Sequence, residues 1–161
     1  MNPSYFKINL SMKEAIDRLN RFVGNAYKEK IETNSKDCVN ICLDQTGQWK
    51  GRCLYAFEKD NWSIFEDLSG SFSGIPVKDW LNFAKGKEVL FAGYNDAIRY
   101  GEFIVVKNGK VEKEFFEVND EPQKRCNKGQ WKIPINSWID IADFMDRDPG
   151  CFSEQGIVLI Y

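Results

Sequence analysis

The sequence contains no histidine among its 161 residues. Histidine is the commonest general base and a common metal ligand, because its unperturbed pKa of about 6.5 lies close to physiological pH. Its absence excludes Ser-His-Asp and Cys-His relays, as well as metal sites that depend on imidazole. Carboxylate, cysteine, lysine and tyrosine chemistry remains, so the composition favours a binding protein over an enzyme.

Long hydrophobic runs and a large excess of either charge are also missing. No apolar run reaches the roughly 18–20 residues of a membrane-spanning helix, and the first residues do not form a signal peptide. Lysine and arginine number 22 against 24 aspartates and glutamates, which gives a net charge of −2. Nucleic-acid binding requires a basic surface that neutralises phosphates. We therefore expect a cytoplasmic protein with neither a nucleic acid nor a membrane as its partner.

Cysteine is present, but not in a pattern that indicates disulfides or a metal site. An odd number of cysteines at irregular spacing is typical of reduced thiols. There is no Cys-x-x-Cys pair, so we expect buried, inert thiols and no metal or cofactor. Two of the thiols lie four residues apart in an expected strand, where they share one face. The five positions are Cys38, Cys42, Cys53, Cys126 and Cys151.

The chain has enough apolar side chains for one core of ordinary size. Apolar residues make up 43% of it and aromatic residues 14%. Ser11 and Glu14 form a capping box that predicts a helix over residues 12–27. Pro76 and Ser137 mark the expected starts of two further helices. Residues 28–37 and 119–128 are polar and indicate connections.

Seven runs have the composition of strands. The strongest local signal is Asn108-Gly109, because these residues tolerate the positive φ angles of a tight type I′ hairpin turn. The elements predict a single α+β domain over residues 1–161, with a mostly antiparallel sheet of about six to seven strands and three helices. The expected strands are residues 39–44, 52–58, 62–67, 88–92, 100–107, 110–117 and 157–161.

Residues 94–102 form the most unusual polar stretch, because they mix aromatic and charged side chains between two strands. Tyrosine and arginine are common anchors at protein interfaces, and loops often carry functional residues. Three interpretations are open: a partner surface, a substrate site, or a plain connection with an Asx turn at Asn95-Asp96. The candidate residues are Tyr94, Asp96, Arg99, Tyr100 and Glu102.

Acidic clusters are the second candidate surface. Glu66 and Asp67 end an expected strand, Asp120 and Glu121 follow the hairpin, and more aspartates lie in the last helix. Local negative potential attracts a basic protein and speeds its capture. Each cluster is also consistent with an ordinary solvated face. Glu66 and Asp67 are adjacent, so a strand directs them to opposite faces of the sheet.

Several motifs together resemble the small acidic immunity proteins that bacteria encode beside polymorphic or contact-dependent toxins, with the SMI1/KNR4-like group as the broad family to test first. The motifs are Trp-x-x-Phe-Glu-Asp at residues 62–67, Trp-Leu-x-Phe-Ala at 80–84, residues 93–102, and Trp-Ile-Asp-Ile-Ala at 138–142. This resemblance implies a protein that binds and neutralises a cognate toxin by occluding its active site or an exosite.

Two other functions remain open from the residues alone. One is a small carboxylate-dependent enzyme, with Asp67, Asp96 or Glu102 as general acid or base. The other is a generic protein-interaction domain without a toxin partner. A deep pocket that brings two of these carboxylates together favours the enzyme, whereas an acidic surface with exposed aromatic residues favours binding.

Overall fold

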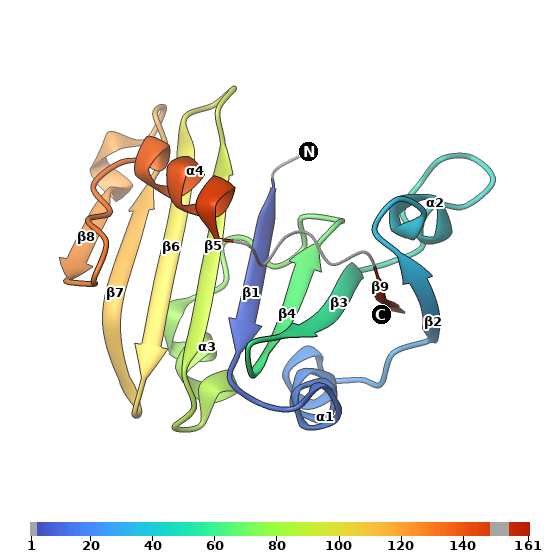
Figure 1. Ribbon diagram of the computed structural model, residues 1–161. Coiled ribbons are helices and arrows are strands. Elements are labelled where there is room, and N and C mark those ends of the chain that lie inside the picture. Colours follow the sequence, from blue (N-terminus) through green and yellow to red (C-terminus); the bar gives the residue numbers. More distant parts are fainter. Residues whose placement is uncertain (1–2, 149–154) are drawn as a thin grey trace.

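One antiparallel sheet of nine strands organises the molecule (Figure 1). The computed structural model describes residues 3–148 and 155–161. The strand order across the sheet is β2-β9-β3-β4-β1-β5-β6-β7-β8, and every neighbouring pair is antiparallel. The strands are β1 (Ser4–Ile8), β2 (Glu29–Asn34), β3 (Cys53–Lys59), β4 (Trp62–Asp67), β5 (Val89–Asn95), β6 (Tyr100–Lys107), β7 (Lys110–Glu117), β8 (Cys126–Gly129) and β9 (Gln155–Ile160).

The prediction of a single α+β domain with a mostly antiparallel sheet is confirmed, but the sheet is larger than predicted. β1, β2 and β8 were not expected. β1 is buried on both faces, so its sequence has no polar and apolar alternation. β2 and β8 are the two edge strands and are largely exposed, so their polar sequences are typical of connections. β1 and β2 also depend on partner strands that are distant in the sequence.

The predicted strand at residues 39–44 is wrong, because this segment contains the short helix α2 (Cys38–Cys42). Val39 and Ile41 are β-branched and favour a strand locally. In the structure, Cys38 and Cys42 lie one helical turn apart and both are buried against the sheet. Tertiary packing of this face therefore overrides the local preference.

Three other helices begin close to where the sequence signals place them. α1 (Met12–Val23) is capped by Ser11, whose side chain accepts from the Glu14 N–H, and it ends at Gly24 with φ 90°. It stops before the predicted residue 27 because Gly24 adopts the left-handed conformation. α3 (Val77–Ala84) follows Pro76, and α4 (Trp138–Arg147) has a complete capping box.

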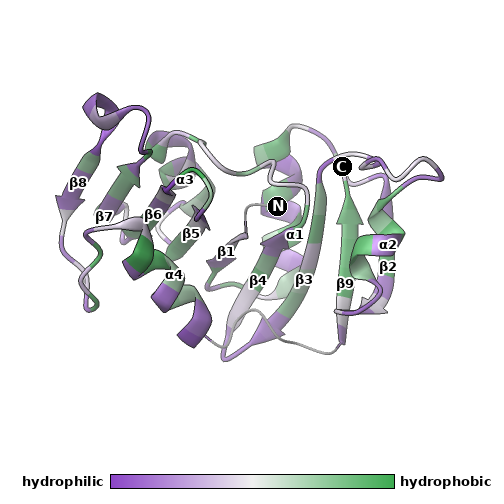
Figure 2. Cartoon of the chain, turned by 90° about the horizontal axis from the view of Figure 1, so that it is seen from above, coloured by the Kyte–Doolittle hydropathy of each residue, from purple (hydrophilic) through white to green (hydrophobic). Residues whose placement is uncertain are grey.

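The helices cover both faces of the sheet, with α1 and α3 on one face and α2 and α4 on the other (Figure 2). Aromatic rings fill the α1/α3 side. Phe6 of β1 stacks on Phe65 with ring centroids 4.9 Å apart and also contacts Trp80 at 5.3 Å. Side chains buried on both faces explain why the central strands are almost wholly apolar.

The hairpin of β6 and β7 is confirmed at its predicted bounds. Asn108 and Gly109 have φ angles of 51° and 71°, as a type I′ turn requires. β5 and β6 form a second hairpin, in which Asn95 pairs with Tyr100. This second hairpin positions the polar stretch that the sequence analysis identified. No helix within the described ranges is long and apolar enough to cross a membrane.

Candidate functional site

The turn between β5 and β6 presents the polar stretch at one end of the sheet. The Asn95 side chain accepts from the Ala97 N–H at 2.9 Å, so the expected Asx turn is present. Arg99 has a φ angle of 50° and donates its backbone N–H to the Asp96 carbonyl at 3.3 Å. Asp96 and Arg99 are exposed, and Ile98 between them is 45% exposed. These three side chains are accessible to a partner.

Other candidates from this stretch have internal roles. The Tyr100 hydroxyl donates to the Glu102 carboxylate, and the Tyr100 ring packs edge-on against Phe116 at 5.7 Å. Glu102 is 3% exposed and also accepts from the Gly74 N–H at 2.9 Å. Tyr94 is half-buried against the core on the α4 side. Burial raises the pKa of Glu102, and burial together with the Glu102 charge raises the pKa of Tyr100.

The Glu66–Asp67 pair divides between the two faces of β4, as alternation requires. Asp67 is 2% exposed and accepts from the Ser71 and Phe72 N–H groups at 3.1 and 2.8 Å. These bonds hold the segment between β4 and α3 against the sheet. Burial raises the pKa of Asp67 and of the half-buried Glu66. Asp67, like Glu102, supports the fold and is not available to a partner.

The carboxylates of the enzyme hypothesis do not meet in one place. Asp67 lies on β4 and Glu102 on β6, with β1 and β5 between them. Three strand spacings separate these two residues, or about 14 Å. Asp96 lies in the exposed turn, beyond the end of β5. This arrangement does not form the close acid–base pair that carboxylate catalysis uses.

α4 lies directly over the start of β6, beside the turn (Figure 1). A Cβ atom on Gly101 would lie 2.8 Å from both Cα and Cβ of Trp138, so only glycine permits this close approach. Glu117 on β7 accepts from the Trp138 N–H and supports the first turn of α4. Arg99 and Trp138 line the same hollow, of about 340 Å³. The turn and the N-terminal end of α4 therefore form one continuous surface.

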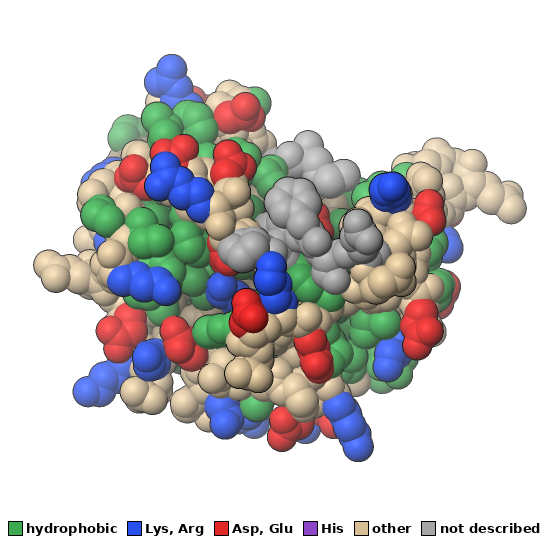
Figure 3. Space-filling view, viewed as in Figure 1, with side chains coloured by type: hydrophobic (Ala, Val, Ile, Leu, Met, Phe, Trp, Pro, Cys, Tyr) green, Lys and Arg blue, Asp and Glu red, His purple; other side chains and the backbone are tan. Residues whose placement is uncertain are grey.

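Three exposed hydrophobic side chains lie in α4, just before it, or in the turn beside it. Among the described residues, four large hydrophobic side chains are exposed: Ile98, Val111, Ile133 and Ile139. Ile139 lies in the first turn of α4 and is 53% exposed, and Ile133 precedes the helix and is 40% exposed. We call Ile98, Ile133 and Ile139, with the exposed Asp96, Asp143 and Asp146, the α4 surface. Hydrophobic and charged side chains lie close together over α4 in Figure 3.

A second hollow, of about 330 Å³, borders the α4 surface on its other side. Ile133, Asp143 and Trp131 contribute to its lining. The Trp131 ring packs against Phe144 of α4 at 5.5 Å, so the segment that carries Ile133 is anchored to the helix. The α4 surface is thus bounded by two shallow hollows and not by a deep pocket.

Asp120 and Glu121 lie in the connection between β7 and β8. Asp120 is exposed, whereas Glu121 forms an ion pair with Lys124. Their neighbours Asn119 and Pro122 line the same hollow as Arg99 and Trp138. This acidic cluster therefore flanks the α4 surface.

The three exposed isoleucines were not identified from the sequence as candidate residues. Ile139 had a usable signal, since it lies outside the apolar stripe that predicts the buried side of α4. Ile98 and Ile133 had none, because an apolar residue in a connection is as often buried as exposed. The close approach of Gly101 to Trp138 brings the turn that carries Ile98 beside α4, and Ile133 lines a hollow with residues of the same helix.

The thiols do not form a metal site in the described ranges. Cys38, Cys42 and Cys53 are buried and free, and Cys126 is half-buried. Burial raises the pKa of Cys38, and a hydrogen bond with Cys53 together with burial raises the pKa of Cys42, which keeps both protonated. Cys151 lies outside the described residues. No group of three potential metal ligands was found within residues 3–148 and 155–161.

Comparisons with protein-family models, with curated proteins and with solved structures found no match to this chain.

Proposed function

We propose that this protein acts by binding another protein through the α4 surface, without catalysis. The observation that carries the proposal is the position of three of the four exposed large hydrophobic side chains of the described residues: Ile139 lies in α4, Ile133 beside it, and Ile98 in the turn next to its first residue. Exposed apolar side chains that form a group mark interaction sites more often than scattered ones do. Charged groups at the edge, here Asp96, Asp143 and Asp146, fit the polar rim of a protein interface.

We further propose that the partner is a bacterial toxin, so that the protein is an immunity protein. The resemblance of residues 62–67, 80–84, 93–102 and 138–142 to such proteins supports this identification. The exposed aspartates of the α4 surface are suited to a partner with basic substrate-binding residues. Binding would block the active site of the toxin or an exosite.

Co-expression with the product of the adjacent upstream gene tests the proposal. We expect rescue of growth and co-purification of the two proteins. Ile139→Asp should weaken the complex by more than about tenfold, because it places a charge on the most exposed hydrophobic side chain of the α4 surface. The matched control is Val111→Asp, which alters the exposed valine on β7, away from α4. Both variants must melt within a few degrees of the wild type for the comparison to hold.

Two results would count against the proposal. If the product of the upstream gene neither binds this protein nor is neutralised by it, that product is not the partner. Equal loss of binding in Ile139→Asp and Val111→Asp removes the α4 surface as the interface.

A further inference from the structure

A groove with several cationic side chains lies on the opposite face of the sheet, between α1 and α3. Its volume is about 520 Å³, within the range of roughly 300–1,000 Å³ that is typical of small-molecule sites. Arg18 and Arg21 of α1, Arg52 before β3 and Lys85 at the end of α3 line it. Asp79 is the one carboxylate in its lining among the described residues. The groove is therefore positive, although the chain as a whole has a net charge of −2.

Most of these cations lack a protein counter-ion. The ion pairs formed within residues 3–148 and 155–161 do not include Arg21, Arg52 or Lys85. Arg18 is held by the carbonyl oxygens of Phe83, at 3.2 Å, and Ala84. Burial lowers the pKa of Arg18, because it disfavours the charged form, and the positive charge of the neighbouring Arg21 lowers it further. An anion in the groove would relieve the repulsion between these charges.

The guanidinium of Arg18 and the backbone of Arg52 are held in place. The contact of Arg18 with the last carbonyls of α3 locks its guanidinium at one end of the groove. The Arg52 backbone exchanges hydrogen bonds of 2.9 and 3.2 Å with Tyr161 of the chain's last segment. The adjacent Gly51 allows this pairing, since a Cβ atom there would lie 2.2 Å from the Tyr161 carbonyl oxygen. A guanidinium held in this way, as that of Arg18 is, loses less conformational freedom when it binds an anion.

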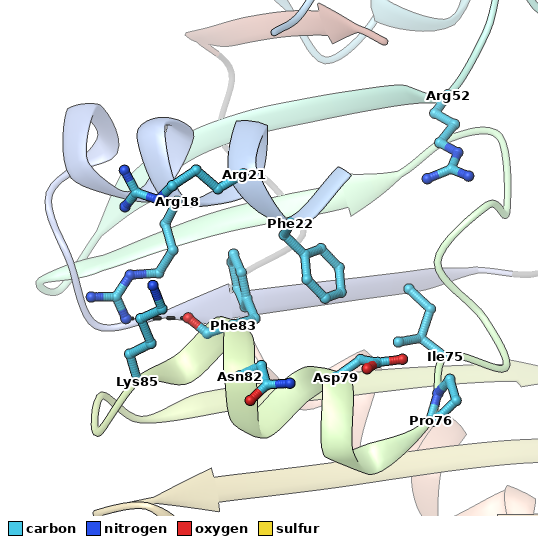
Figure 4. Close-up of a pocket in the computed structure, with 10 residues that line it drawn as sticks. All are labelled: Arg18, Arg21, Phe22, Arg52, Ile75, Pro76, Asp79, Asn82, Phe83 and Lys85. Carbon is cyan, nitrogen blue, oxygen red and sulfur yellow. Dashed lines mark hydrogen bonds between the residues drawn. The ribbon is translucent and has the colours of Figure 1, made fainter. Parts of the chain in front are cut away.

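The floor between the cations is aromatic. Phe22 of α1 is half-buried, and its ring centroid lies 5.1 Å from that of Phe83 and 5.6 Å from that of Trp80. Figure 4 shows Arg18, Arg21 and Lys85 gathered at one end and Arg52 at the other, with Phe22 and Phe83 between them. A flat apolar group is suited to such a floor, because offset rings attract one another.

We propose that this groove binds a small organic anion, whose phosphate or carboxylate is held by Arg18 and Arg21, whose flat apolar body lies on Phe22, and whose far end faces Arg52. Arginine recognises both groups through paired hydrogen bonds of matching geometry. The site is independent of the α4 surface, which lies on the other face of the sheet.

Titrations followed by NMR test this site with four probes: AMP, phenyl phosphate, adenosine and inorganic phosphate. We expect AMP and phenyl phosphate to shift the side-chain Nε signals of Arg18, Arg21 and Arg52 and the ring signals of Phe22. Adenosine lacks the anionic group, and inorganic phosphate lacks the flat body. Each should bind at least about tenfold more weakly than AMP, which corresponds to the loss of about one strong contact.

Arg21→Ala and Arg52→Ala should each weaken AMP binding by about tenfold or more. Both side chains are exposed, so the fold should be retained. Lys13→Ala is the matched control, because Lys13 is an exposed cation on α1 outside the groove. The proposal is overturned if neither aromatic phosphate binds at millimolar concentration, or if the arginine variants bind AMP as well as Lys13→Ala does. Inorganic phosphate that binds as tightly as AMP would overturn the assignment of an organic anion.

Discussion

Glu102 illustrates how a single buried carboxylate serves the fold. Its carboxylate accepts from the Gly74 N–H and from the Tyr100 hydroxyl while the side chain is almost fully buried. Burial raises the pKa of Glu102, so the folded state favours the protonated form more than the unfolded chain does. The stability that this group contributes is fully present below the unfolded pKa and is lost as the pH rises through the folded pKa.

Glu102→Gln should therefore raise the melting temperature at pH 7, because glutamine keeps an acceptor for both donors and cannot ionise. The difference from the wild type should vanish below about pH 4, where the unfolded carboxyl is also protonated. Thermal melts at several pH values measure this. A lower melting temperature for Glu102→Gln at pH 7 would show that the ionised carboxylate is the stabilising form.

Glu102→Ala provides the contrast, because it removes the acceptor altogether. The Gly74 N–H and the Tyr100 hydroxyl then lose their buried partner. We expect a loss of about 1–3 kcal/mol in the free energy of unfolding, measured by urea denaturation. Stability equal to that of Glu102→Gln would contradict the role assigned to these two hydrogen bonds.

At the scale of elements, the position of α4 depends on one glycine. A methyl group on Gly101 would lie 2.8 Å from the backbone of Trp138 and 3.0 Å from Ile141 Cδ1. The helix must move away to accommodate it. Gly101→Ala should cost about 1–3 kcal/mol in the free energy of unfolding, as overpacked cores do, and should weaken partner binding through the α4 surface.

Ser137→Ala distinguishes a loss of stability from a displacement of α4. It removes the side chain that accepts from the Asp140 N–H at 3.3 Å, at a cost of about 1 kcal/mol, without pushing α4 away from β6. Urea denaturation and partner binding are measured for both variants. If Gly101→Ala is as stable as the wild type, α4 and β6 do not pack closely enough at Gly101 to exclude a methyl group.

At the scale of the whole molecule, the sheet should open from its edges. β1 lies in the middle of the strand order and pairs with both β4 and β5. β8 is an edge strand of four residues, three of which are exposed. Amide hydrogen exchange depends on local opening, which is easiest where few apolar contacts hold a strand.

We expect the amides of β1 and β5 to exchange only by global unfolding, with opening free energies of about 5–15 kcal/mol. The amides of β8 should exchange several orders of magnitude faster, by local fraying. Hydrogen exchange followed by NMR measures both. Equal protection of β1 and β8 would indicate a sheet that opens only as one unit.

Local sequence signals anticipated the caps and the tight turn. Ser11 with Glu14 and Ser137 with Asp140 begin helices, and Asn108-Gly109 closes a hairpin, because each structure is stabilised by bonds within a few residues. Such bonds form regardless of what the rest of the chain does. The α+β class follows from these elements and from the alternation of the other strands.

Strand order, burial and the candidate surface depended on contacts between distant segments. β1 pairs with strands about 60 and 85 residues further along the chain. Residues 38–42 are helical because a helix buries Cys38 and Cys42 together against the sheet. Alternation placed Asp67 and Glu102 on a face of the sheet, but it could not say that the segment before α3 covers them. Ile98 lies near α4 for the same reason, because the packing of Gly101 against Trp138 brings the β5–β6 turn to the start of a helix about 40 residues further along the chain.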